Sequence, residues 1–177
     1  MKQIKKWQIF ATIICLILGV ILHFTYEWSN ENNIVAAFSA VNESTWEHLK
    51  LVVYPILLTS IVGKIILKKD LKNYWFATLI GMISAIAFIT VFFYTYTGII
   101  GKNFAILDIG SFFVGVFIAE YIIYKLLISS IGTKYNIISS IAILVITFSF
   151  IYFTYHPLKI NYFQDPVNKT YGIYKEM

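Results

Sequence analysis

Histidine and glutamate side chains gather in two short segments of this sequence. One is the stretch 23–29, HFTYEWS, and the other is the stretch 38–51, FSAVNESTWEHLKL. Together they supply His23, Glu27, Glu43, Glu47 and His48, with Asn42 and Trp46 beside them. Catalytic zinc sites use imidazole and carboxylate ligands and keep one position for water. These residues therefore indicate a site for a divalent metal ion such as Zn²⁺, with His23, Glu27 and His48 as candidate ligands.

The remaining polar residues have candidate roles around such an ion. A metal-bound water attacks an ester or amide when a carboxylate takes its proton, and Glu43 and Glu47 are the candidate general bases. Asn42, Trp46 and Asp165 are candidate supporting residues. The sequence contains no HExxH or other strict zinc motif, so spacing alone does not establish a metal site.

Most of these residues also have an ordinary structural explanation. Ser44-x-x-Glu47 fits a capping box that begins a helix. Trp46 fits the aromatic belt at a membrane surface, and an interfacial His23 bonded to Glu27 fits the end of a transmembrane helix. The convergence of several such residues leaves the two interpretations about equally open.

The composition places the chain in a membrane. Of its 177 residues, 59% are hydrophobic and 13% are charged, whereas about a quarter of the residues are charged in soluble domains. All fourteen basic residues are lysines, so the chain lacks the arginine forks that recognise phosphates and base edges. We expect a lipid bilayer as its surroundings and no nucleic acid as a partner. The sequence determines neither a protein partner nor an oligomeric state.

Five apolar runs are long enough to cross a bilayer. They predict an all-α bundle forming one membrane domain, residues 1–177, with transmembrane helices over 7–26, 48–67, 74–97, 108–127 and 135–155. The apolar octet 34–41 is too short to span and predicts a short interfacial or re-entrant helix. Within the second span, Pro55 predicts a kink, and Lys50 is expected to extend toward water.

The distribution of lysines predicts the orientation, because positive residues are retained on the cytoplasmic side. A cytoplasmic N-terminus places nine of the fourteen lysines inside: Lys2, Lys5, Lys6, Lys64, Lys68, Lys69, Lys72, Lys125 and Lys134. Seven of the nine acids then lie outside: Glu27, Glu31, Glu43, Glu47, Asp108, Asp165 and Glu176. The same topology puts His23, His48 and His156 at the outer ends of the first, second and fifth spans, and makes the C-terminus extracytoplasmic.

Glu120 is an isolated carboxylate within the fourth span. An unpaired charge at that depth is expensive, so Glu120 needs either a proton or a partner. Lys64, near the inner end of the second span, is the candidate partner. A structural ion pair, a hydrogen-bonded neutral carboxyl and a proton relay are all compatible with the sequence.

Three blocks of sequence carry a resemblance: residues 23–29, residues 38–51 and YFQDPVNKTYGIY at 162–174. They resemble an uncharacterised family, a domain of unknown function, of small five-span bacterial integral membrane proteins. The residues that match the pattern are His23, Glu27, Asn42, Glu43, Trp46, Glu47, His48, Asp165, Pro166, Tyr171 and Gly172, whereas His156 departs from it. The resemblance implies the cytoplasmic (inner) membrane and brings no activity, cofactor or partner. We expect the tail, 158–177, to fold back over the mouth of the first two spans.

Three classes of function are compatible with these observations. The first is a metal-dependent membrane enzyme that acts on a lipid headgroup or an envelope peptide. The second is a non-catalytic accessory protein with an exposed aromatic patch that includes Trp28 and Trp46. The third is a small ion-coupled transporter that uses Glu120 as a proton relay.

Overall fold

The computed structural model describes residues 1–67, 71–129 and 131–173, and the chain in these ranges is helical. The helices are α1 (Lys2–Trp28), α2 (Asn33–Ala36), α3 (Thr45–Leu67), α4 (Tyr74–Ile100), α5 (Ala105–Leu127), the 3₁₀ helix η1 (Thr133–Tyr135) and α6 (Asn136–Tyr155). Lys68, Lys69, Asp70 and Glu176, which entered the prediction of orientation, lie outside the described residues.

Five of the described helices are long and apolar enough to cross a membrane: α1, α3, α4, α5 and the segment Thr133–Tyr155 that contains α6. This confirms the prediction of an all-α chain with five candidate spans. Where a helix ends, the local sequence gives the reason. Gly101, with φ of 80°, follows α4, and His156-Pro157 follows α6. The helix expected over 34–41 is one turn long, because α2 ends at Ala36.

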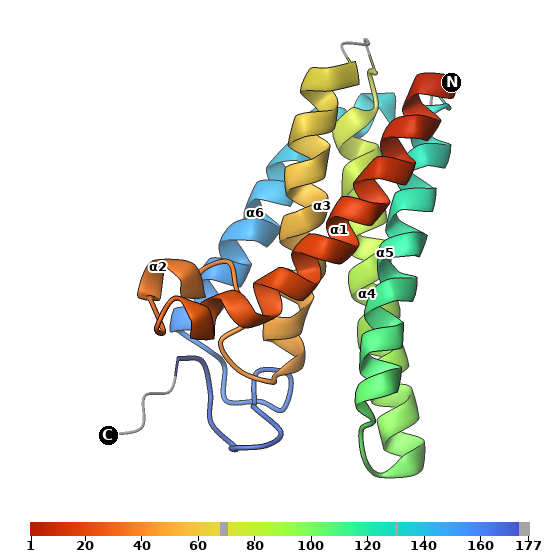
Figure 1. Ribbon diagram of the computed structural model, residues 1–177. Coiled ribbons are helices and arrows are strands. Elements are labelled where there is room, and N and C mark those ends of the chain that lie inside the picture. The colour runs from red at the N-terminus through yellow and green to blue at the C-terminus, as the bar shows by residue number, and fades with distance from the viewer. Residues whose placement is uncertain (68–70, 130, 174–177) are drawn as a thin grey trace.

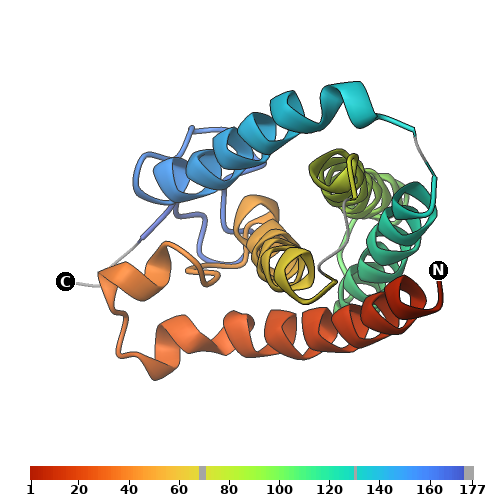
Figure 2. The same ribbon diagram turned by 90° about the horizontal axis from the view of Figure 1, so that it is seen from above.

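Helix α3 occupies the interior of the bundle. It contacts α1, α4, α5 and α6, and the view from above shows it enclosed by the other long helices (Figure 2). In its most apolar 18-residue window, 61% of the residues are buried, compared with 22% in α1. Polar groups on α3 therefore have protein and not lipid around them, and they must find partners there.

Gly19 allows α1 to approach α3 closely. A Cβ atom at this position would lie 2.6 Å from the carbonyl oxygen of Leu51. That carbonyl is four residues before Pro55, which has no N–H to donate to it. A small residue at such a crossing lets two backbones pack directly, as is common between membrane helices.

One end of the bundle collects segments that are far apart in the sequence. The end of α1, helix α2, the start of α3, the end of α6 and the C-terminal tail all lie at the end opposite the N-terminus (Figure 1). The residues singled out in blocks 23–29, 38–51 and 162–173 therefore reach the same region.

Candidate metal centre

His23, Glu43 and His48 form a cluster at this end of the bundle. The His48 Nε2 atom lies 3.5 Å from one carboxylate oxygen of Glu43, and the His23 Nε2 atom lies 4.0 Å from the other. One ligand atom from each of the three residues lies within 4.8 Å of the other two. The two imidazole rings are 5.2 Å apart, measured between centroids, in an edge-to-face arrangement.

Three different segments position the three side chains. His23 lies in the last turns of α1, Glu43 lies in the loop before α3, and His48 lies in the first turns of α3. Ser44 caps α3, because its Oγ atom accepts the Glu47 N–H at 3.4 Å. The cap sets the start of the helix, which fixes the direction in which His48 points.

The hydrogen bond made by His48 suits a metal ligand. Its Nδ1 atom lies 3.0 Å from the carbonyl oxygen of Ser44, and a carbonyl can only accept, so Nδ1 carries the proton. In the neutral imidazole, this tautomer leaves Nε2, the atom 3.5 Å from Glu43, with a free lone pair. Metal-binding histidines are usually held in this way, with the second ring nitrogen donating to a carbonyl or carboxylate.

The dimensions of the cluster are close to those of a zinc site. Zinc binds nitrogen and oxygen ligands at about 2.0–2.2 Å, so two ligand atoms of one tetrahedral ion lie about 3.3–3.6 Å apart. The His48–Glu43 distance is in this range, whereas His23 is 4.0 Å from the other carboxylate oxygen, and the three ligand atoms within 4.8 Å of one another would be drawn together by side-chain rotation. All three side chains are partly exposed, which leaves room for this rotation and for a water ligand. The donor set therefore fits one divalent ion with an open position.

The C-terminal tail holds the loop that carries Glu43. The carboxylate of Asp165 is buried and accepts the backbone N–H of Val167 at 2.7 Å and that of Asn168 at 3.1 Å, which shapes a turn. The Glu43 N–H lies 3.4 Å from the same carboxylate. Asn42 donates from its side-chain amide to the carbonyl of Gly172 at 3.0 Å. Asn42 and Asp165 therefore support the cluster from either side of Glu43.

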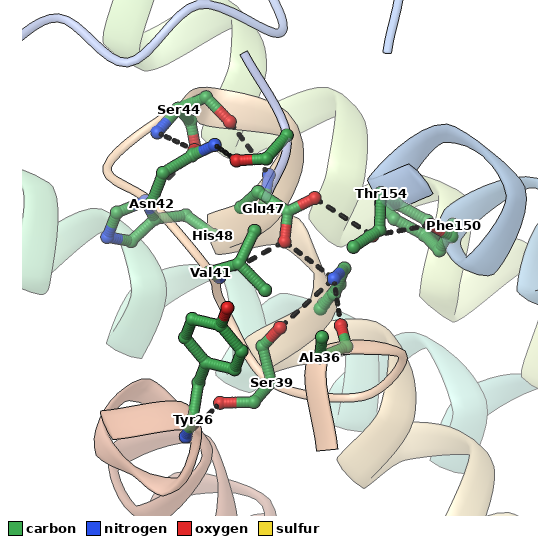
Figure 3. Close-up of polar contacts among 12 residues, drawn as sticks. Tyr26, Ala36, Ser39, Val41, Asn42, Ser44, Glu47, His48, Phe150 and Thr154 are labelled. Carbon is green, nitrogen blue, oxygen red and sulfur yellow. Dashed lines mark hydrogen bonds and ion pairs between the residues drawn. The ribbon is translucent and has the colours of Figure 1, made fainter. Parts of the chain in front are cut away.

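Glu47 lies apart from the cluster and is fully engaged (Figure 3). Its carboxylate is 2% exposed and forms an ion pair with Lys50 at 2.5 Å. It also accepts the Thr154 hydroxyl at 2.9 Å and the Val41 N–H at 3.2 Å. The Glu47 carboxylate is therefore bound by three donors from within the protein, outside the cluster of His23, Glu43 and His48.

Lys50 corrects an expectation from the sequence. Its side chain does not extend toward water, because it is completely buried. Besides the ion pair, its ammonium group donates to the carbonyl of Ala36 at 2.8 Å and to that of Ser39 at 3.0 Å. The end of α2 and the residues after it bring both carbonyls to this point (Figure 3). Lys50 therefore holds the segment between α1 and α3 by hydrogen bonds to its backbone carbonyls.

Glu27 and Trp46 are not part of the three-residue cluster. Glu27 lies one turn beyond His23, and its side chain is exposed, outside the three-residue cluster. Trp46 stacks on Phe150 with ring centroids 4.3 Å apart and packs against Phe163 at 4.8 Å. It anchors the tail and α6 to α3, whereas Trp28 is exposed. The aromatic patch expected to join the two tryptophans is therefore not formed.

Glu120 has partners other than Lys64. Its carboxylate accepts the side-chain amide of Gln8 at 2.9 Å and lies 3.5 Å from the thiol of Cys15. Lys64 instead places its ammonium group 5.3 Å from the centre of the Tyr74 ring. The expected pair does not form because α1, and not α3, supplies the polar group that reaches Glu120. Cys15 precedes His23 by eight residues, about 12 Å along a helix, so the two polar groups are separate.

A cavity of about 420 Å³ adjoins the cluster. His23, Glu43 and His48 line it together with a second acid, Asp108, which accepts hydrogen bonds from Tyr96 and Asn103. Its remaining walls come mainly from apolar residues of α1, α3, α4 and α5, and from the tail. Its volume is in the range of small-molecule sites. Sequence patterns gave no sign of this cavity, because its walls are ordinary transmembrane residues.

Comparison with known proteins identifies the family. A model of a family of unknown function, DUF6512, matches residues 1–173, and the chain belongs to this family. With five helices that are long and apolar enough to span a bilayer, the family member described here has the features of a multi-pass membrane protein. No curated protein and no solved structure matches the chain.

Proposed function

We propose that this protein is a metal-dependent enzyme of the bacterial cytoplasmic membrane, with an extracytoplasmic site that hydrolyses a lipid headgroup or an envelope peptide. The observation that carries the proposal is the cluster of His23, Glu43 and His48 beside a cavity. Two imidazoles and one carboxylate are a donor set of catalytic zinc sites, in which the fourth position holds water.

The proposed orientation of the protein in the membrane rests on the distribution of lysines. Lysines near the N-terminus and near the link between α3 and α4 favour a cytoplasmic location for that end of the bundle. The cluster lies at the opposite end (Figure 1), so it faces the extracytoplasmic side. We also propose that blocks 23–29, 38–51 and 162–173 form the family's shared site, because their residues meet at this end of the bundle.

The proposed reaction needs one water and no other reactant. A metal ion lowers the pKa of its bound water to about 7. His23, His48 and one carboxylate oxygen of Glu43 would hold the ion, which would supply an activated water for attack on an ester or amide carbonyl. The second oxygen of Glu43 would accept the proton of that water and return it to the leaving oxygen or nitrogen as the bond to the leaving group breaks. Of the two candidate general bases, Glu43 is therefore the one proposed for this role.

Product analysis in reconstituted vesicles tests this function. We expect purified protein with Zn²⁺ to release a hydrolysis product from vesicle lipids or from added envelope peptides, detected by mass spectrometry. A chelator and the variant Glu43→Gln should each abolish the product, whereas His156→Ala, which changes an exposed histidine outside the cluster, should not. Product that persists with chelator, or in Glu43→Gln, would contradict the metal-dependent mechanism. Zinc binding without any product would favour the accessory-protein alternative, and zinc-dependent proton movement would favour the transporter.

A further inference from the structure

The cavity next to the metal site has the form of a receptor for an acyl chain. From the cluster, its walls continue along Val20 and Phe24 of α1, Leu51 of α3, Ile89 of α4 and Ile109 of α5. These residues lie in helices that are candidate membrane spans. The cavity therefore combines polar groups, at the cluster and around Asp108, with apolar walls on helices that are candidate membrane spans.

The cavity is accessible from the side of the bundle. Val20 is 47% exposed and Ile109 is 58% exposed, although both line it. Helices α1 and α5 cross at their cytoplasmic ends in the proposed orientation and diverge toward the other end (Figure 1). In a bilayer, the surroundings of exposed apolar residues on two spanning helices are lipid chains. A membrane lipid can enter by this route without leaving the hydrocarbon region.

The chemistry of the walls decides between the two substrates of the proposed function. A peptide in this cavity would place its backbone N–H and C=O groups against Val20, Leu51 and Ile89, which offer no hydrogen-bonding side chain. Unpaired backbone groups in an apolar environment are costly. An acyl chain has no such groups and gains free energy from every CH₂ that it buries. The walls therefore favour a lipid.

The polar end defines the headgroup. A metal ion held by His23, Glu43 and His48, which all line the cavity, would accept a phosphate or ester oxygen as a further ligand. We propose, resting on the metal-dependent function above, that the ligand is a phospholipid with its phosphate or ester group at this ion and one acyl chain in the cavity.

Photolabelling tests the position of the acyl chain. The probe is an ether-linked phosphatidylethanolamine with a diazirine near the end of one chain, because ether links resist ester hydrolysis. Wild-type protein loaded with Zn²⁺ should be labelled mainly in the cavity segments 19–24 and 109–113. The double variant Val20→Trp/Ile109→Trp narrows the cavity and should reduce this labelling by roughly tenfold, the effect expected when about two CH₂ groups lose contact.

The matched control places two tryptophans elsewhere on the lipid-facing surface. Leu144 and Val145 of α6 are 55% and 60% exposed and do not line the cavity, so Leu144→Trp/Val145→Trp should leave the labelling of 19–24 and 109–113 unchanged. Equal labelling of α6 and of the cavity segments, or labelling that Val20→Trp/Ile109→Trp does not reduce, would show lipid at the surface only and would overturn the proposal.

Zinc measurement on the same samples separates this proposal from the function on which it rests. Zinc that binds normally to Val20→Trp/Ile109→Trp while labelling falls supports a lipid in the cavity. Zinc bound to wild-type protein without preferential labelling overturns the lipid and leaves the metal site standing. A wild-type protein that binds no zinc overturns the metal-dependent function, and the headgroup contact with it. The headgroup contact also requires that His48→Ala, but not His156→Ala, weaken the labelling.

Discussion

The side-chain amide of Asn42 donates a hydrogen bond to the carbonyl oxygen of Gly172, 130 residues further along the chain, at 3.0 Å. Asn42 also accepts the Ser44 N–H at 2.9 Å, so one side chain joins the tail to the cap of α3. Glu43 lies between Asn42 and Ser44 in the sequence. The tail is therefore part of the structure that holds Glu43, a residue of the candidate metal site, in place.

Replacing Gly172 should detach the tail. Gly172 has φ of 61°, and a Cβ atom there would lie 2.7 Å from the carbonyl oxygen of Thr154. We expect Gly172→Ala to weaken zinc binding roughly tenfold, as loss of a supporting contact typically does, and to expose the tail to protease. Gly98→Ala is the matched control, because nothing lies within 4 Å of its added methyl group. Equal proteolysis of the two variants would contradict a docked tail.

Removing one member of the Glu47–Lys50 pair should destabilise the protein strongly. Loss of one partner leaves a buried charge without compensation, which costs about 3–5 kcal/mol. We therefore expect Glu47→Gln and Lys50→Met each to lower the free energy of unfolding in detergent by several kcal/mol, and the double variant to recover part of the loss.

Glu27→Gln is the control for the buried pair, because Glu27 is an exposed glutamate at the same end of the bundle. Its free energy of unfolding should stay within about 0.5 kcal/mol of wild type, as for most surface substitutions. A Glu47→Gln protein as stable as Glu27→Gln but inactive would contradict the structural position of Glu47 and restore it as a general base.

The Glu120–Gln8 contact predicts different effects for two substitutions. Glu120→Gln keeps an oxygen that accepts from Gln8, whereas Glu120→Ala leaves the buried Gln8 amide without its acceptor, at a cost of about 1–3 kcal/mol. Chemical denaturation should therefore show Glu120→Ala as clearly the less stable variant. If both variants were as stable as wild type and both lost proton movement in vesicles, the proton-relay interpretation of Glu120 would be supported instead.

Zinc binding should weaken as the pH falls. Imidazole ligands must be deprotonated to bind a metal, so protons compete with the ion for the ring nitrogens. For each histidine ligand, the zinc affinity should therefore fall by at most about tenfold for every unit by which the pH is lowered. Titrations of zinc between pH 7.5 and pH 5.5 measure this effect. If the zinc affinity stayed the same over that pH range, imidazole ligands would be excluded.

The apolar runs were sufficient to predict the helical bundle, because the length of an uncharged run is a local property. The proximity of His23 and His48 followed from the topology, which puts the end of one span beside the start of the next. The apolar octet 34–41 did not predict that α2 is only one turn long. The carbonyls of Ala36 and Ser39 instead accept hydrogen bonds from Lys50. A local pattern contains no information about such a convergence.

Partners that are neutral and distant in sequence were not predictable. Gln8 and Thr154 bind Glu120 and Glu47 across more than one hundred residues, and neither carries a charge that would mark it as a partner. The one available signal was Gln8 itself, an amide within an otherwise apolar run. Glu43 and Glu47 look equivalent in the sequence, and their separation into an exposed ligand and a buried ion pair depends on the start of α3.

The zinc content of the purified protein is the most direct test of the metal centre. After loading with Zn²⁺ and removal of excess metal, plasma mass spectrometry should find about one zinc per wild-type chain, as for one His₂Glu site. His156→Ala should retain this zinc, whereas His23→Ala, His48→Ala and Glu43→Ala should each lose it or bind it roughly a hundredfold more weakly. Wild-type protein without zinc, or zinc retained equally by His48→Ala and His156→Ala, would contradict the account.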